Sequence, residues 1–256
     1  MRVIPVIDLL NGFAVHAVKG DRKNYAPLQS ILCNQPDPIT IARSFRTQLG
    51  LGEMYVADLN SIQCLDNSRH RRLISTLASN DRMDIILDAG VSAVEDAIAW
   101  MNTGVRKVVI GAETLQAITA IDQIPMQLDG NRIIFSLDLR AGKILSQCRE
   151  LAAMSPIKAL DRLQSAGWRE VILLDLIRVG SGTGIDLALV EEARHQFPGL
   201  NLLVGGGIAC VEQLEDLCKT GVAGVLLATA LHSGIITARH ISSIHELGDR
   251  NGGAPH

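Results

Sequence analysis

Five aspartates follow apolar runs along the chain and could carry acid–base chemistry. They are Asp8, Asp58, Asp88, Asp138 and Asp175, and we expect each of them at the carboxyl end of a strand. An ionised aspartate inside a barrel is unfavourable unless it is paired or solvated, so this set predicts a polar cavity. Two carboxylates, one of them with a raised pKa, can act together in proton transfer. We predict that role for Asp8 and Asp138, expected on symmetry-related strands across the cavity mouth.

A structural role is the alternative for some of these carboxylates. They could cap loop amides or pair with Lys19, Arg140 or Arg178, and we favour this interpretation for Asp58 and Asp175. The position of Asp88 stays open between a ligand and a loop amide. The candidates for a polar pocket are Asp58, Asp88, Arg140 and Lys19, and Asp175 is kept as a catalytic candidate.

A run of glycines predicts a phosphate site in the second half of the chain. Gly205, Gly206 and Gly207 follow an apolar run, and successive glycines leave backbone N–H groups open to one anion. Ala228 and Thr229 end the next run, and a short helix expected from Leu231 would point its amino terminus at the same anion. Gly180 is a further candidate. The alternative is that the glycines only form a tight turn.

The first half carries the same positions in altered form. Gly111 and Ala112 follow one apolar run, but Asp88, Ala89 and Gly90 stand where the second half has its glycine triplet. A carboxylate there would repel a phosphate by up to several kcal/mol if both were poorly solvated. We therefore predict one working phosphate site and one doubtful site.

These matched positions belong to a repeat that covers the chain. The pairs Asp58 and Asp175, Gly90 and Gly207, and Gly111 and Ala228 are separated by one constant spacing. This regularity predicts two half-repeats, about 1–125 and 126–248. The predicted strands are Val3–Asp8, Met54–Asp58, Ile85–Asp88, Lys107–Gly111, Arg132–Asp138, Glu170–Asp175, Leu202–Gly205 and Val222–Thr229.

Helical patterns lie between the predicted strands. Pro38 opens the first, Ser92 and Glu95 form a predicted capping box, and Ser155 with Pro156 predicts another helix start. Helices are also expected over Asp186–Phe197 and Val211–Thr220, with Gly104 and Gly221 as helix-ending glycines. Alternating strands and helices in two similar halves predict an α/β fold, a single (β/α)8 TIM barrel over 1–248 with a flexible tail over 249–256. A doubly wound open sheet is the alternative.

Composition narrows the classes of function. The chain has 256 residues, 47% hydrophobic and only 3% aromatic, with a net charge of −3. No basic patch or apolar run of spanning length stands out, so we expect neither nucleic-acid nor membrane binding. The five scattered cysteines and the start of the chain, which runs directly into a strand, indicate reduced thiols in a cytoplasmic protein without a signal peptide. We expect no cofactor and no transition metal. A ring of carboxylates could also hold Mg²⁺ beside a phosphate.

The chain resembles the half-barrel family of histidine biosynthesis. The resemblance lies in residues 4–12, 19–21, 56–59, 137–140, 205–208 and 224–231, and it covers nearly the whole sequence. Members include phosphoribosylformimino-5-aminoimidazole carboxamide ribotide isomerase and the cyclase subunit of imidazole glycerol phosphate synthase. The resemblance implies isomerisation of an aminoaldose phosphate to an aminoketose phosphate, with Asp8 as the base.

Several positions depart from the family pattern. The resemblance places the general acid after the sixth strand in an Asp-Gly-Thr segment, where this chain has Val179. His16, Ala228 and Thr229 stand where the family has arginine, glycine and arginine. Some relatives with such changes are associated with one-carbon metabolism through methanopterin or methanofuran cofactors. The resemblance to them implies an isomerase-like enzyme that acts on a smaller substrate with a single phosphate.

Two other functions stay open at the level of sequence. The chain could be the authentic histidine-pathway isomerase, with Asp175 supplying the acid. It could also be a non-catalytic protein that binds a phosphorylated metabolite. The sequence leaves the oligomeric state and the identity of the substrate open.

Overall fold

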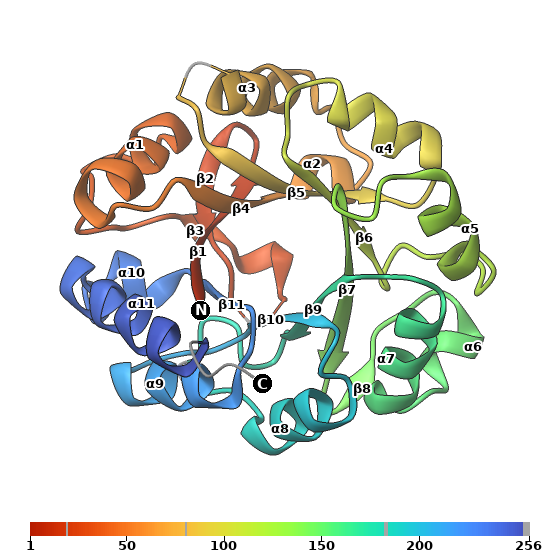
Figure 1. Ribbon diagram of the computed structural model, residues 1–256. Coiled ribbons are helices and arrows are strands. Elements are labelled where there is room, and N and C mark those ends of the chain that lie inside the picture. Colours follow the sequence, from red (N-terminus) through yellow and green to blue (C-terminus); the bar gives the residue numbers. More distant parts are fainter. Residues whose placement is uncertain (19, 80, 182–183, 253–256) are drawn as a thin grey trace.

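Eight parallel strands close into a barrel, and helices form a ring around it (Figure 1). The computed structural model describes residues 1–18, 20–79, 81–181 and 184–252. Closure comes from pairing of the last barrel strand with the first, in which Arg2 lies opposite Gly224. The barrel strands are β1 (Arg2–Leu10), β4 (Glu53–Asp58), β5 (Asp84–Val91), β6 (Lys107–Gly111), β7 (Ile133–Arg140), β9 (Glu170–Asp175), β10 (Asn201–Gly205) and β11 (Gly224–Leu227). The predicted TIM barrel is confirmed, and the open sheet is wrong because these strands leave no free edge in the barrel.

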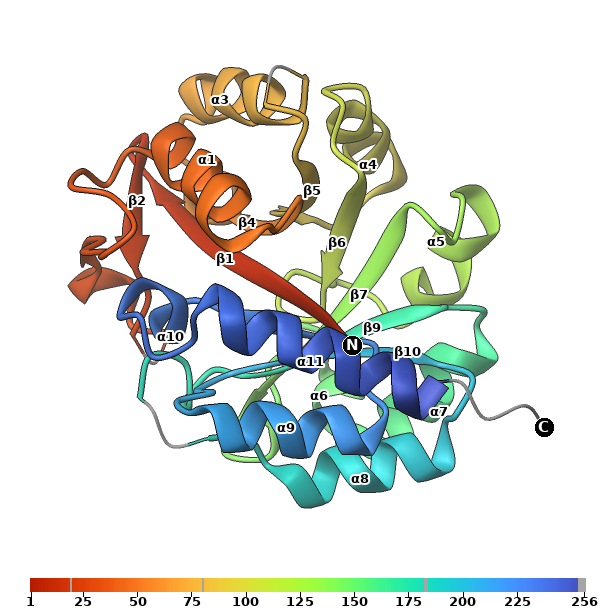
Figure 2. The ribbon, with the colours of Figure 1, turned by 60° about the vertical axis from the view of Figure 1, so that its left-hand side comes forward.

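Short strands and a 3₁₀ helix lie in the loops that follow the barrel strands β1 and β7. They include strands β2 (Phe13–His16), β3 (Ala26–Pro27) and β8 (Lys143–Ile144), and the short 3₁₀ helix η1 (Arg22–Asn24). The helices are α1 (Pro38–Leu49), α2 (Leu59–Ile62), α3 (Ser68–Ser79), α4 (Val94–Met101), α5 (Ala120–Gln127), α6 (Arg149–Ala152), α7 (Pro156–Ser165), α8 (Leu187–Gln196), α9 (Val211–Thr220), α10 (Thr229–His232) and α11 (Ala238–Gly252). In Figure 2, α9 and α11 lie side by side near the amino terminus of β1.

The barrel interior is filled by aliphatic side chains and one tyrosine. Because side chains alternate along a strand, each barrel strand sends one set inward and the other toward the helices. The inward set includes Ile4, Tyr55, Ile86, Val109, Ile134, Ile172, Leu203 and Leu226. At the amino-terminal end, Glu170 pairs with Arg2 and Lys107. Above this packed interior, a cavity opens at the carboxyl ends of the strands.

Most predicted helix starts are confirmed, and the predicted capping box is wrong. Ser155 caps α7 by accepting from the amide of Lys158 at 3.3 Å, and Asp186 caps α8. Gly221 ends α9 in the left-handed conformation, as predicted. The capping box at Ser92 does not form, because α4 begins later and its cap residue Ala93 offers no side-chain acceptor.

Several strand ends differ from the prediction, and in β1 the cause is a local hairpin. β1 continues to Leu10, since the left-handed turn at Asn11 and Gly12 leads into antiparallel pairing with β2. Asp8 therefore lies within a strand, opposite Ala57 on one side. β11 instead stops at Leu227, and α10 begins at Thr229, two residues before the predicted helix.

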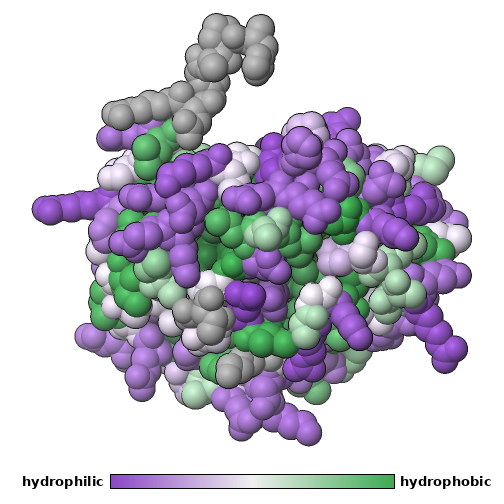
Figure 3. Space-filling model, turned by 90° about the horizontal axis from the view of Figure 1, so that it is seen from below, coloured by the Kyte–Doolittle hydropathy of each residue, from purple (hydrophilic) through white to green (hydrophobic). Residues whose placement is uncertain are grey.

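The face of the molecule in Figure 3 is largely hydrophilic, and patches of hydrophobic side chains lie among the hydrophilic ones. Within the described residues, no helix has the length and apolar character needed to cross a membrane. The last helix, α11, reaches Gly252, so it includes the first part of the segment predicted as a flexible tail. Residues 253–256 of that segment lie outside the described residues.

Candidate active site

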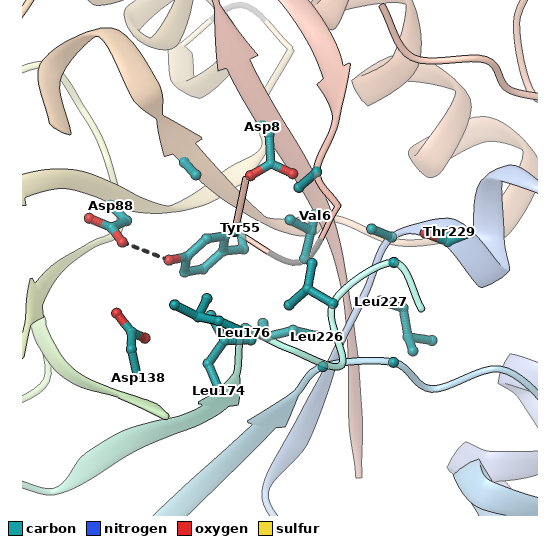
Figure 4. A pocket seen from close by; sticks show the side chains of 18 of the residues that line it. Val6, Asp8, Tyr55, Asp88, Asp138, Leu174, Leu176, Leu226, Leu227 and Thr229 are labelled. Atoms are coloured by element: carbon teal, nitrogen blue, oxygen red, sulfur yellow. Dashed lines mark hydrogen bonds between the residues drawn. The ribbon is translucent and has the colours of Figure 1, made fainter. Parts of the chain in front are cut away.

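A cavity of about 450 Å³ opens at the carboxyl ends of the barrel strands (Figure 4). Residues from both the first and the second half of the chain line it. The predicted site residues that line it are Asp8, Asp88, Asp138, Arg140, Gly180, Gly206, Gly207, Ala228 and Thr229. Val179, which stands where the resemblance expects an acid, also lines this cavity.

Burial strongly alters the acidity of Asp8 and Asp138. Burial raises the pKa of Asp8 to about 7, Asp88 adds to this rise, and Arg22 opposes it. Burial likewise raises the pKa of Asp138 to about 7, against the hydrogen bond that Ser136 Oγ donates to its Oδ1 at 2.7 Å. Groups with a pKa near 7 are populated in both protonation states at neutral pH, as general acids and bases require.

Tyr55 and Asp88 lie between these two aspartates in the cavity. The Tyr55 hydroxyl donates to Asp88 Oδ2 at 2.9 Å (Figure 4), and the amide of Gly90 donates to Oδ1 at 3.1 Å. Burial raises the pKa of Asp88 although both hydrogen bonds lower it. Asp88 therefore accepts from a loop amide and also lines the cavity.

Sequence reasoning missed several polar groups of the cavity. Arg22, from η1, donates through Nη2 to Glu113 Oε2 at 2.8 Å, and both side chains line the cavity. Tyr25 and Tyr55 line it as well, and they are the chain's only two tyrosines. Because aromatic residues are scarce in this chain, the two tyrosines could have been singled out from the sequence as candidate site residues. Arg22 and Glu113 offered no such signal, because their pairing depends on two distant loops.

The glycine loop after β10 is shaped by close backbone packing. Gly206 and Gly207 have φ angles of 110° and 78°, in the region that side chains disfavour. A Cβ on Gly207 would lie 2.5 Å from the carbonyl oxygen of Arg178 in the loop after β9. Within the described part of the chain, the amides of Gly206, Gly207 and Ala228 donate to no acceptor. The loop thus combines a tight packing role with N–H groups that are available to an anion.

We expect Gly207→Ala to lower the free energy of unfolding by about 2–4 kcal/mol, since it adds a backbone clash to an unfavourable φ. Gly221→Ala is the matched control, because Gly221 has a φ of 77° but nothing within 4 Å of its added Cβ. The control substitution should lower the free energy of unfolding by about 1 kcal/mol. Urea denaturation of both variants measures the difference, and equal losses would contradict the packing role.

Asp58 and Asp175 are engaged away from the cavity wall. Asp58 is fully buried, caps α2, and accepts from His70 Nδ1 at 2.6 Å. His70 Nε2 in turn accepts from the amide of Gly12 at 2.7 Å, so the imidazole is neutral with its proton on Nδ1. Asp175 binds Arg178 at 2.9 Å, in the arrangement that the structural interpretation predicts.

Four other predicted residues lie apart from the cavity or outside the described structure. Gly205 lines a separate space of about 350 Å³ behind the loop after β9, together with Asp175. Gly111 and Ala112 are buried outside the cavity wall, and the amide of Ala112 donates to the carbonyl of Ser136 at 2.8 Å. Lys19 lies outside the described residues. Among the residues that are described, no three His, Cys, Asp or Glu side chains group closely enough to hold a metal ion.

The fold and the cavity together define a class of protein, an eight-stranded α/β barrel with carboxylates and a glycine loop at one open end. Comparison with known families is more specific. The chain belongs to the family described as histidine biosynthesis protein, whose model matches residues 2–237.

Individual relatives span nearly the whole chain. An uncharacterised protein of Methanocaldococcus jannaschii is 31% identical over 253 residues, covering 97% of this chain and all of the relative. A Leuconostoc mesenteroides 1-(5-phosphoribosyl)-5-((5-phosphoribosylamino)methylideneamino)imidazole-4-carboxamide isomerase is 24% identical, covering 94% of this chain and 99% of the relative. The isomerase of the same name from a strain of Thermus thermophilus is 27% identical, covering 94% and 99%. The chain is thus a member of an isomerase-containing family.

Proposed function

We propose that the chain is an isomerase that moves a proton along a small aldose or aminoaldose carrying a single phosphate. The observation that carries this proposal is the asymmetry of the two half-repeats. After β10, the amides of Gly206 and Gly207 are free among the described residues, whereas after β5 the amide of Gly90 is already occupied by the carboxylate of Asp88. One anion site is therefore open, and the other is filled by the protein's own anion.

The open site lies where two loops meet. The free amides of Gly206 and Gly207 come from the loop after β10, and that of Ala228 comes from the loop after β11. The Thr229 hydroxyl adds a polar group at the same wall, with His16 Nε2 at 3.2 Å from it. Unpaired amides that line one cavity from two loops are suited to bind the oxygens of a phosphate.

Asp8 and Asp138 supply the proton transfers in this proposal. Asp8 as carboxylate removes the proton from the carbon next to the aldehyde or imine, while Asp138 as carboxylic acid protonates the oxygen or nitrogen on the first carbon. The enediol or enaminol that forms takes the proton back from Asp8 on the first carbon, and Asp138 recovers its proton from the oxygen on the second. Substrate and product have the same composition, so no co-reactant is needed.

Asp138 replaces the missing family acid in this scheme. Val179 cannot transfer a proton, and Asp175 is held by Arg178 away from the cavity, whereas Asp138 lines the cavity with a pKa near 7. A role in one-carbon cofactor biosynthesis rests on the resemblance to relatives in that context and stays a prediction.

The test is solvent exchange on a panel of aldose and aminoaldose monophosphates. Incubation in D₂O followed by NMR should reveal deuterium on the first or second carbon of at least one compound, together with its ketose isomer. Absence of exchange across the panel, despite binding of a monophosphate, would favour a non-catalytic metabolite-binding protein.

The phosphate site has its own test. Thr229→Asp places a carboxylate beside the free amides, and we expect it to weaken monophosphate binding at least about tenfold by charge repulsion. Thr229→Asn is the matched control of nearly the same size and no charge, and it should change the dissociation constant less than about threefold. Isothermal titration calorimetry measures both. Equal dissociation constants for the two variants would mean that the phosphate does not bind at this loop.

The reaction of the isomerase relatives is the second candidate, favoured by their 24% and 27% identity over nearly the whole chain. Growth of a histidine auxotroph that lacks this isomerase, complemented with the present chain, would support that reaction. No growth despite soluble expression would favour the monophosphate substrate.

A further inference from the structure

The cavity wall opposite the glycine loop is acidic. Asp88 and Asp138 lie on one side of the cavity and Thr229 on the other (Figure 4). Glu113 belongs to the same wall as these two aspartates, since it adds to the rise that burial causes in the pKa of both. A ligand that places its phosphate at the glycine loop would therefore extend its other end toward carboxylates.

One of these carboxylates has an oxygen that is open to the cavity. Asp138 is only 6% exposed, and its side chain points into the cavity (Figure 4). Its Oδ1 accepts from Ser136, but within the described residues its Oδ2 has no donor. Because this oxygen faces the cavity and accepts from no described group, it is available to a donor on a bound ligand.

The protein's own cations only partly neutralise the wall. Four carboxylates line the cavity, Asp8, Asp88, Asp138 and Glu113, against the two described guanidinium groups of Arg22 and Arg140. Arg22 is already paired with Glu113, and Arg140 is exposed at the mouth. The acidic groups near Asp138 therefore retain an excess of negative charge when they are ionised.

Apolar groups separate the acidic wall from the glycine loop. Leu174, Leu176, Leu226 and Val6 lie around the middle of the cavity in Figure 4, between Asp138 and Thr229. The cavity thus offers anion-binding amides at one end, an apolar middle and carboxylates at the other end. This order of surfaces matches a ligand with opposite charges at its two ends.

We propose that the substrate carries a protonated amine at the end remote from its phosphate, and that Asp138, Asp88 and Glu113 form the site that selects it. An ammonium group brings three N–H donors and a positive charge, so it can satisfy Asp138 Oδ2. A second phosphate at this wall would be repelled by the same groups. The inference rests on the proposed monophosphate function and adds the chemical class of the substrate's other end.

This site and the proposed chemistry are compatible at Asp138. A carboxylic acid next to a neutral amine and a carboxylate next to an ammonium differ only in the position of one shared proton. The contact that binds the nitrogen is then also the contact through which Asp138 delivers its proton in the isomerisation of an aminoaldose.

The test compares three ligands of equal chain length by isothermal titration calorimetry. They are an aminoalkyl phosphate, the corresponding hydroxyalkyl phosphate and the alkanediol bisphosphate, each measured over a series of chain lengths. At the best length, the ammonium end should improve affinity over the hydroxyl end about tenfold, which is about 1.4 kcal/mol, and the bisphosphate should bind most weakly. Equal or weaker binding of the aminoalkyl phosphate would overturn the inference.

Substitutions in the acidic wall test whether the ammonium group binds there. Glu113→Gln and Asp88→Asn should each reduce the preference for ammonium to about threefold or less, with the affinity for the hydroxyalkyl phosphate nearly unchanged. Glu95→Gln, on the exposed side of α4, is the matched control and should keep the full preference. Thermal unfolding establishes whether each variant is folded. If Asp88→Asn does not fold, Glu113→Gln still provides the test. A preference that survives Glu113→Gln places the amine elsewhere and contradicts the assignment.

The outcomes separate this inference from the function on which it rests. If no monophosphate binds, the proposed function fails and the inference fails with it. If both monophosphates bind equally well, only the inference fails. Mg²⁺ titrated alone provides a further check, because binding of Mg²⁺ that competes with the aminoalkyl phosphate would assign the wall to a metal ion instead.

Discussion

Asp8→Asn is expected to slow deuterium incorporation into the substrate by about 10³-fold, because asparagine cannot accept a proton from carbon. Asp138→Asn should cause a loss of similar size, since it removes the acid while its amide oxygen can still accept from Ser136. Both substitutions preserve side-chain size, and both should leave the dissociation constant for inorganic phosphate unchanged within about threefold. NMR of exchange in D₂O measures the rates, and calorimetry measures binding.

Asp37→Asn is the matched control for these two variants. Asp37 caps α1 by accepting from the amide of Thr40 at 2.9 Å, and asparagine caps helices about as well as aspartate. Its activity should therefore equal that of the wild type. A wild-type rate in Asp8→Asn would rule out Asp8 as the base, whatever the result for Asp138→Asn.

The same two substitutions should stabilise the protein at alkaline pH, an effect opposite in sign to their effect on activity. A raised pKa means that the folded protein holds the proton of Asp8 or Asp138 more tightly than the unfolded chain does. Between the unfolded pKa of 3.8 and the folded pKa of about 7, the free energy of unfolding must fall as pH rises. Above this range, the wild type contains buried ionised carboxylates that the asparagine variants lack.

We expect each variant to exceed the wild type in free energy of unfolding by about 1–3 kcal/mol at about pH 8. The difference should shrink toward zero as pH falls to about 4, where the aspartates of the folded protein are protonated. Denaturation across this pH range measures the trend, and Asp37→Asn should show no such gain. A stability difference that does not change with pH would mean that neither carboxyl group is held protonated by its surroundings.

Local sequence patterns were sufficient to predict the barrel strands. Their apolar runs have the length and order of buried parallel strands, and β6 and β9 have the predicted bounds, Lys107–Gly111 and Glu170–Asp175. The strand ends were less predictable where a neighbour extends the pairing. β1 passes beyond Asp8 because β2 folds back on it, and β7 reaches Arg140 because β8 pairs with it.

The predicted site was only partly a matter of local sequence. Asp8, Asp138 and the glycine loop lie at the cavity because strand order alone brings the carboxyl ends of parallel strands together. The sequence did not reveal why Gly206 and Gly207 must be glycine, since the clash that excludes a side chain comes from the carbonyls of Asp175 and Arg178.

The sequence by itself determined the barrel and the end of the barrel where polar groups gather, because periodic apolar runs and the residues that end them are local properties of the chain. Tertiary structure decided which partners the aspartates meet. Asp58 is held by His70, while Asp138 keeps an oxygen without a donor among the described residues. It also decided that Arg22 meets Glu113. These outcomes depend on contacts between distant loops, and the burial that moves the pKa values of Asp8 and Asp138 arises only when the barrel closes.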